Sequence, residues 1–129
     1  MVTYILDTHV LLWASTTPER LGGAERLLAD ADRRIVSAVC VLELAIKQHL
    51  GKLSLGSDVR TWSRRVTTEL ALDHLPVTAE HAATVEHLPD VHRDPFDRLL
   101  VAQAVSEGVV LLTADDRLTG YGDAVRLVG

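Results

Sequence analysis

The sequence contains one cysteine and no long apolar run. Cys40 has no partner for an internal disulfide, and its neighbours Val39 and Val41 are typical of a small buried residue rather than a reactive thiol. The apolar runs fall far short of the about 20 residues that a membrane-spanning helix requires. The N-terminus has neither the basic region nor the cleavage site of a signal peptide. We therefore expect a cytoplasmic protein with no membrane partner.

The sequence also lacks the ligand spacing of a zinc site. Its six histidines form no HxxxH or HExxH pattern, so we expect each of them on the surface or beside a site, rather than as a zinc ligand. Basic residues are not in excess either, because 13 Lys and Arg stand against 18 Asp and Glu, which gives a formal net charge of -5. That balance alone disfavours a nucleic-acid partner. Cations bound to several of the carboxylates would remove most of the negative excess.

The sequence does contain enough apolar residues for one domain core. With 129 residues, of which 47% are hydrophobic, the chain matches a single domain over residues 1–129 that buries about two-thirds of the surface of its unfolded form. Short apolar runs predict strands, and amphipathic segments between them predict helices. The expected strands are residues 2–7, 35–37, 109–112 and 125–128, with a short extended segment over residues 75–77. The expected helices are residues 8–15, 24–32, 38–50, 57–72, 78–88 and 95–107. This alternation predicts an α/β fold of three layers, with helices on both faces of a central, mostly parallel sheet.

Capping residues, proline and glycine predict where several helices begin and end. Asp94 followed by Pro95 is typical of a helix start, and Gly108 is expected to end the same helix. Ser57 and Thr78 are expected to cap two further helices. These signals fix the expected boundaries more sharply than the apolar pattern does.

The helix expected over residues 38–50 carries an apolar stripe. Its members recur at helical spacing and are Val39, Leu42, Ile46 and Leu50. Glu43 lies within this apolar stretch, so we expect the segment to be largely buried.

Four carboxylates lie at separate points of the chain where a parallel α/β fold brings its loops together. Asp7 follows the first strand, and Asp115 follows the strand over residues 109–112. Glu43 lies early in a helix, and Asp97 lies in the first turn of another. Functional crevices of open α/β sheets lie beyond the carboxyl ends of the strands. We therefore expect these four acids to form one pocket.

An acidic pocket of this kind is suited to a hard divalent cation. Mg²⁺ prefers oxygen ligands, and Mn²⁺ is the expected substitute. Without a cation the carboxylates would repel one another and raise one another's pKa values, so the pocket should be less stable empty than filled. A bound cation also lowers the pKa of a coordinated water that can attack a phosphodiester. We expect hydrolysis by metal-activated water, and the expected metal-binding and catalytic residues are Asp7, Glu43, Asp97 and Asp115.

Each of these acids also has a purely structural interpretation. Asp7 is placed to cap the helix that follows it, and Asp97 is placed to interact with the dipole of a helix that Asp94 caps. Glu43 precedes Lys47 by four residues, which is the favourable order for a helical ion pair. Because Asp115 and Asp116 are adjacent in a turn, either of them can face the pocket. The residues expected to cap helices or to support the site are Ser37, Lys47, Asp94 and Asp116.

A group of basic residues with one tryptophan is the candidate for nucleic-acid contacts, and so for RNA contacts if the substrate is RNA. Arg60 and Arg64 lie on one face of the helix expected over residues 57–72, where they could contact phosphates, and Trp62 beside them could stack on a base. Arg98 is a further candidate. The alternative interpretations are a solvated helix surface for the arginines and core packing for Trp62.

Five stretches, spread over the whole chain, carry a family resemblance. They are Leu6-Asp7-Thr8-His9, Ser37-Ala38 with Leu42-Glu43-Leu44-Ala45-Ile46-Lys47, Leu50-Gly51-Lys52-Leu53, the run from Arg93 to Ala104, and Leu112-Thr113-Ala114-Asp115. The most specific part is Asp94-Pro95-Phe96-Asp97-Arg98-Leu99-Leu100 with Ala102-Gln103-Ala104 behind it. With these motifs the chain resembles the PIN-domain ribonucleases of the VapC type, the toxins of type II toxin–antitoxin systems.

The resemblance implies a PIN-like fold with Asp7 and Asp97 as the central Mg²⁺ ligands, and with Glu43 and Asp115 completing the site. Asp115 is favoured over Asp116 because it follows a threonine by two positions, as in the family pattern. The resemblance also implies an endoribonuclease that acts on structured RNA, such as tRNA or rRNA, and that forms a homodimer. A cognate antitoxin, inserting a C-terminal segment near the acidic pocket, would hold it inactive.

Three other functions are compatible with parts of the pattern. A phospho-accepting receiver domain also has an acidic Mg²⁺ pocket, but here Asp7 stands alone, the second strand ends in Ser37, and no lysine follows Leu112. A structure-specific DNA nuclease of the same fold shares the phosphodiester chemistry. A PIN-like binding module without metal would have lost some of the four acids, whereas all are present.

Overall fold

A fully parallel sheet of five strands forms the centre of the molecule. The computed structural model describes residues 2–128, so Met1 and Gly129, the two ends of the expected domain, lie outside the described residues. The strand order is β3-β2-β1-β4-β5, and each neighbouring pair is parallel. The strands are β1 (Thr3–Leu6), β2 (Arg33–Ser37), β3 (Asp73–Leu75), β4 (Val110–Thr113) and β5 (Val125–Leu127). The parallel sheet expected from the sequence is confirmed.

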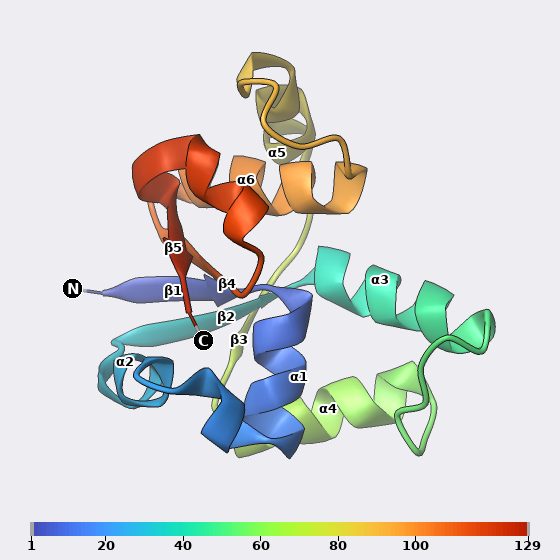
Figure 1. Ribbon diagram of the computed structural model, residues 1–129. Coiled ribbons are helices and arrows are strands. Elements are labelled where there is room, and N and C mark those ends of the chain that lie inside the picture. Colours follow the sequence, from blue (N-terminus) through green and yellow to red (C-terminus); the bar gives the residue numbers. More distant parts are fainter. Residues whose placement is uncertain (1, 129) are drawn as a thin grey trace.

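Helices cover both faces of this sheet, which confirms the three expected layers. The α-helices are α1 (Thr8–Thr16), α2 (Ala24–Asp30), α3 (Ala38–His49), α4 (Val59–Glu69), α5 (Ala79–Thr84) and α6 (Pro95–Glu107). Short 3-10 helices are η1 (Pro18–Leu21), η2 (Val85–His87) and η3 (Asp116–Ala124). In Figure 1, α1, α2 and α4 lie on one side of the strands, and α5 and α6 lie on the other. Within residues 2–128, no helix has both the length and the apolar character needed to cross a membrane.

The neighbouring strands β1 and β4 contain a deeply buried part of the core. Ile5 pairs with Leu111 and Leu6 pairs with Leu112, and all four side chains are almost fully buried. Burial of one such side chain contributes about 1.5–3 kcal/mol, so the register of this pair is firmly set. Directly after β1, the backbone N–H of Asp7 donates to the carbonyl of Leu112 at 3.0 Å. The core thereby fixes Asp7 at the carboxyl end of the sheet.

Most of the expected helix boundaries are confirmed. Asp94 caps α6, Thr78 caps α5, and Gly108 follows α6 in the left-handed conformation with a φ of 67°. The cap of α4 differs from the expectation, because Asp58 rather than Ser57 accepts a backbone N–H of the first turn. A carboxylate accepts a stronger hydrogen bond from a backbone N–H than a neutral hydroxyl does, which accounts for the difference.

The apolar stripe of α3 is only partly buried, contrary to the expectation. Val39 belongs to the core, but Leu42, Ile46 and Leu50 are 52%, 39% and 58% exposed. Two neighbouring rows of this helix are apolar, and the row that includes Leu44 packs inward instead. The sequence pattern cannot distinguish the two rows, because both have helical spacing. The outer row therefore forms an exposed apolar face on α3.

Candidate metal centre

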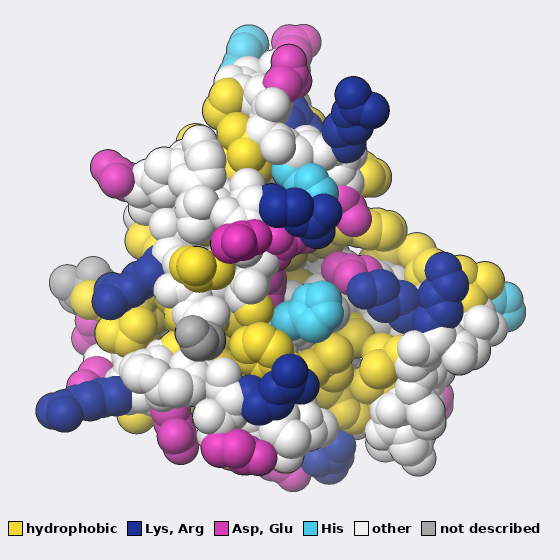
Figure 2. Space-filling model, in the orientation of Figure 1, with side chains coloured by type: hydrophobic (Ala, Val, Ile, Leu, Met, Phe, Trp, Pro, Cys, Tyr) yellow, Lys and Arg dark blue, Asp and Glu magenta, His cyan; other side chains and the backbone are white. Residues whose placement is uncertain are grey.

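The four acids predicted to bind metal all line one pocket at the carboxyl end of the sheet. The pocket has a volume of about 160 Å³. Its lining residues are Asp7, Thr8, His9, Glu43, Lys47, Asp94, Asp97, Asp115 and Arg117. Figure 2 shows acidic, basic and histidine side chains around a hollow near the middle of one face of the molecule. The convergence that the sequence predicted is therefore present.

Asp7 both caps a helix and faces the pocket, so its two interpretations are compatible. Its Oδ1 accepts the backbone N–H of Val10 at 2.9 Å, and its Oδ2 accepts the hydroxyl of Thr113. The side chain is almost fully buried at the end of β1. Burial raises the pKa of Asp7, and the hydrogen bonds from Thr113 and Val10 oppose that shift. A cation in the pocket would offset the cost of holding this carboxylate in its charged form.

Glu43 forms the predicted ion pair with Lys47, but inside the pocket instead of on an open helix surface. The Nζ of Lys47 lies 2.6 Å from Oε2 of Glu43, whose side chain is 14% exposed. The hydroxyl of Thr8 donates to the other carboxylate oxygen at 2.8 Å. Both oxygens of Glu43 therefore have partners from the chain, one of them cationic.

Asp97 lies beside a second acid and a histidine. Nε2 of His92 lies 3.0 Å from Oδ2 of Asp97, and Asp94 accepts the backbone N–H of Asp97 at 3.2 Å. One ligand atom from each of His92, Asp94 and Asp97 lies within 4.8 Å of the other two, close enough for all three to hold one ion. Burial, and then the charge of Asp94, raise the pKa of Asp97 to about 6. Asp94 thus caps α6, as expected, and is also placed to act at the site.

Asp115, and not Asp116, faces the pocket. Asp116 is exposed and does not line the pocket. Asp115 caps η3 and forms a two-oxygen ion pair with Arg117, whose Nη2 lies 2.8 Å from Oδ2. The hydrogen bond from Arg117 lowers the pKa of Asp115. The backbone N–H of Asp115 donates to the hydroxyl of Thr113 at 3.0 Å, so Thr113 connects Asp115 with Asp7.

Three residues of the site have roles that sequence reasoning missed. His92 and Arg117 are each paired with one of the predicted acids, and Thr113 bridges two of them. Thr113 belongs to the motif Leu112-Thr113-Ala114-Asp115, but its hydroxyl contacts depend on how the ends of β1 and β4 meet. His92 lies in a loop and Arg117 in the short 3-10 helix η3, so no periodic spacing signals their contacts.

The donor set of the pocket fits a hard divalent cation. Each predicted acid contributes carboxylate oxygens, and the imidazole of His92, which lies beside Asp97, is also an acceptable ligand for Mn²⁺. A soft metal has no thiolate here, because Cys40 is fully buried beside the carbonyl of Leu6 and does not line the pocket. A bound cation would compete with Lys47 and Arg117 for the carboxylates that they now neutralise.

Ser37 supports the site from outside the pocket. Its hydroxyl accepts the backbone N–H of Val39 at 3.0 Å, which caps α3, and it donates to Oε1 of Gln103 in α6. Both Ser37 and Gln103 are fully buried. This link joins the start of the helix that carries Glu43 to the helix that carries Asp97. The expectation of a capping role for Ser37 is confirmed.

Two of the four RNA-contact candidates are wrong. Trp62 is 2% exposed and belongs to the core, so it cannot stack on a base. The guanidinium of Arg98 donates to the carbonyls of Val85, Leu88, Pro89 and His92 and to the hydroxyl of Tyr121, so it stabilises the loop before α6 instead. Arg60 and Arg64 are exposed on α4, but neither lines the acidic pocket.

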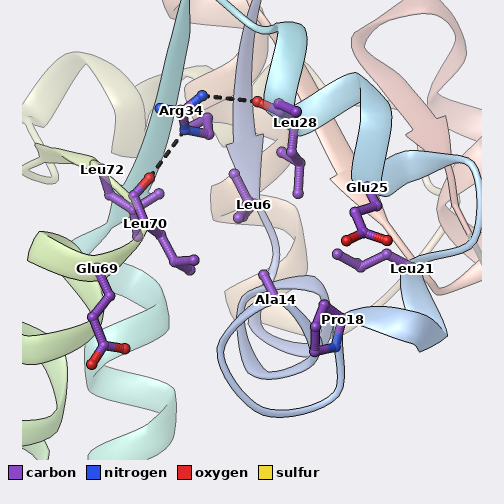
Figure 3. A pocket seen from close by; sticks show the side chains of 11 residues that line it. Leu6, Ala14, Pro18, Leu21, Glu25, Leu28, Arg34, Glu69, Leu70 and Leu72 are labelled. Carbon is purple, nitrogen blue, oxygen red and sulfur yellow. Dashed lines mark hydrogen bonds between the residues drawn. The ribbon is translucent and has the colours of Figure 1, made fainter.

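A second and larger hollow has a different chemistry. It lies among α1, η1, α2 and α4 and is lined mainly by leucines, alanines and a proline (Figure 3). Its one arginine, Arg34, donates to the carbonyls of Leu28 and Leu70. Glu25 and Glu69 lie at opposite sides of the hollow. No group of acids converges there on one point, so this hollow is not a second metal centre.

The sequence of the chain matches a known domain family over nearly its whole length. The family model described as "PIN domain" matches residues 4–123. A relative from Mycobacterium tuberculosis, named ribonuclease VapC22, is 33% identical over 123 residues, which cover 94% of this chain and 93% of the relative.

Solved structures share the fold at lower sequence identity. A chain of the VapBC2 complex from Rickettsia felis, bound to a DNA fragment from its promoter, matches with a TM-score of 0.75 and 15% identity, covering 99% of this chain and 100% of that chain. A chain of the DNA-bound VapBC complex from Salmonella typhimurium matches with a TM-score of 0.68 and 19% identity, covering 98% and 97%. At these identities the likeness concerns the fold.

Proposed function

Because this chain belongs to the PIN domain family, we propose that it is an endoribonuclease that hydrolyses RNA phosphodiester bonds with Mg²⁺ and acts as the toxin of a toxin–antitoxin pair. The observation that carries this proposal is the convergence of the four predicted acids on one pocket. The 33% identity with a relative named ribonuclease VapC22 supports the activity. The likeness to chains of VapBC complexes supports the fold that the activity needs.

In this proposal Asp7, Glu43, Asp97 and Asp115 hold the cation, and Mn²⁺ can replace Mg²⁺. When bound, the cation supplies a water of lowered pKa and neutralises charge on the reacting phosphate. The residues of the chain bind and orient it. Asp97, with a pKa of about 6, must lose its proton before it can act as a ligand, so the activity should rise with pH through this range.

Lys47 and Arg117 have a second part in this proposal. Each is now paired with an acid of the pocket, Lys47 with Glu43 and Arg117 with Asp115. With a cation held by those carboxylates, the two side chains would be available to contact phosphate oxygens of the substrate. They would therefore help to bring a polyanion to a pocket that is otherwise negatively charged.

A cognate antitoxin and a homodimer belong to the same proposal. A solved structure with this fold, from Klebsiella pneumoniae, is named a toxin-antitoxin complex, which supports a partner of that kind. For the homodimer, the support is the exposed apolar face of α3 formed by Leu42, Ile46 and Leu50. Contiguous exposed apolar side chains are uncommon on monomeric proteins, and a second copy of this chain could cover them. Cytoplasmic location stays a prediction from the sequence.

Cleavage of RNA with defined variants tests the activity. We expect the parent protein to cleave total RNA when Mg²⁺ is present and not in a chelator. Asp97→Asn and Asp115→Asn should each lower the cleavage rate by at least about 100-fold, the upper end of losses seen when the surroundings of a metal are altered. Asp116→Asn is the matched control, since Asp116 is exposed and outside the pocket.

Two results of this experiment would contradict the proposal. If Asp97→Asn cleaves RNA as fast as Asp116→Asn, the site is wrongly assigned. If the parent cuts single-stranded and structured DNA while leaving RNA intact, the chain is the DNA nuclease instead. A protein that binds no Mg²⁺ or Mn²⁺ in a calorimetric titration would be the metal-free binding module.

A further inference from the structure

A row of three side chains on α1 and η1 leads away from the acidic pocket. His9 lines the pocket and is exposed, and Trp13 follows it one helical turn later, with the two ring centroids 6.5 Å apart. The guanidinium of Arg20 lies over the indole of Trp13, 4.8 Å from the ring centroid. We call His9, Trp13 and Arg20 the aromatic row. It forms a continuous surface that starts at the site of the proposed chemistry.

The charge of Arg20 is available for a ligand. The side chain is exposed, and over residues 2–128 no carboxylate lies within ion-pair distance of it, whereas Arg26, Arg33 and Arg65 are each paired with an acid. The contact of Arg20 with Trp13 leaves its full positive charge in place. An exposed, unneutralised guanidinium beside an aromatic ring is the combination with which proteins bind single-stranded nucleic acid.

Trp13 is held firmly enough to serve as a stacking surface. Its side chain is half-buried and packs against the core on one side. Trp62 is buried in the core, so of the two tryptophans it is Trp13 that can meet a base. Every base has a flat π-face, and both an indole and the guanidinium that covers it can stack on that face.

We propose that the aromatic row is the subsite that binds the RNA nucleotide next to the cleaved phosphate. The base of that nucleotide stacks on the Trp13–Arg20 pair, and the charge of Arg20 holds the phosphate beyond it. His9 lies between this pair and the acids, so the chain of the substrate passes over it. This proposal rests on the proposed function, because it needs RNA as the substrate.

Binding of a short single-stranded RNA oligonucleotide tests the subsite. The measurement is made in the Asp97→Asn background, so that the RNA stays intact, with Trp13→Leu and Arg20→Gln as variants. Leucine keeps the apolar contact with the core but removes the flat ring. The control is Arg26→Gln, which removes the same charge from an arginine that is already paired with Asp30.

The expected results differ between the two variants. Trp13→Leu should raise the Kd for RNA on the order of ten-fold, the loss that one stacked base gives. Arg20→Gln should weaken binding and reduce the slope of log Kd against log salt by about 0.7, the value for one contact with the phosphate of a single strand. Arg26→Gln should change neither. RNA should also protect the tryptophan fluorescence from quenching by acrylamide, and this protection should be absent in Trp13→Leu.

The outcome separates the subsite from the proposed function. If the parent protein cleaves RNA but Trp13→Leu and Arg20→Gln bind it as Arg26→Gln does, the subsite is wrong and the nuclease stands. If RNA binds without protecting the tryptophan fluorescence, the subsite is equally wrong. If the parent neither binds nor cleaves RNA, the proposed function itself fails.

Discussion

The acids of the pocket differ in their surroundings, and this difference determines how each responds to a cation. Burial raises the pKa values of Asp7 and Asp97, whereas the hydrogen bond from Arg117 lowers the pKa of Asp115. A cation therefore stabilises the first two most, because it offsets the burial penalty of their charged forms. Asp115 already has a positive partner, and a cation would have to compete with it.

The pH dependence of stability tests the surroundings of Asp97. Its pKa is about 6 in the folded protein, against the ordinary value of 3.8 for an aspartate side chain. Between these two values the folded protein holds the proton that the unfolded chain has lost. The contribution of Asp97 to the free energy of unfolding is therefore present at low pH and falls as the pH rises through this window. Asp97→Asn should remove this dependence, which denaturant unfolding of the metal-free protein at several pH values measures.

The same experiment has a built-in control. Asp116→Asn changes an exposed carboxylate, and its unfolding free energy should follow the parent at every pH. The free energy of unfolding of Asp97→Asn, minus that of the parent, should increase from about pH 4 to pH 7. Parallel curves for the parent and Asp97→Asn would show that the burial of this carboxylate has no such effect.

At the scale of elements, the position of the pocket depends on how α3 and α6 are joined. The hydroxyl of Ser37 caps α3 and donates to Gln103 of α6 in a fully buried contact. These helices carry Glu43 and Asp97, which come from distant parts of the sequence. The link therefore sets how far apart two of the proposed ligands lie.

Replacement of Ser37 should lower the free energy of unfolding. Replacement of Ser57, which the sequence wrongly predicted as a cap, should leave it nearly unchanged. Ser37→Ala removes an N-cap, worth about 0.5–2 kcal/mol, and leaves the buried amide oxygen of Gln103 without its donor, worth about 1–3 kcal/mol. We expect a loss of about 2–4 kcal/mol in the free energy of unfolding, measured by urea titration. Ser57→Ala should lie within about 0.5 kcal/mol of the parent, because Asp58 is the cap of α4. Equal losses in both variants would contradict this account.

At the scale of the whole molecule, the sequence predicts the parts that depend on apolar runs and on local caps. The runs fix where β1 and β4 end, and hence that Asp7 and Asp115 lie at the same edge of the sheet. The cap at Asp94 fixes Asp97 in the first turn of α6. Because these signals are local and strong, the convergence of the acids could be predicted before any coordinates were known.

Other features depend on contacts that no local pattern encodes. The sequence leaves Trp62 open between an RNA contact and core packing, and the face of α4 that carries it packs into the core. Arg98 looked like a free cation, but its guanidinium binds carbonyls of the preceding loop. In the pairs of His92 with Asp97 and of Arg117 with Asp115, one partner, His92 or Asp115, lies in a loop whose conformation is set by packing and not by periodicity.

Calorimetric titration of Mn²⁺ or Mg²⁺ into the purified protein tests the central claim, that the converging acids form one cation site. We predict binding to the parent near pH 7, weaker binding near pH 5 because Asp97 takes up a proton, and unchanged binding for Asp116→Asn. Asp97→Asn should lose most of the affinity at both pH values. Binding of the cation to Asp97→Asn as tightly as to the parent would contradict the account.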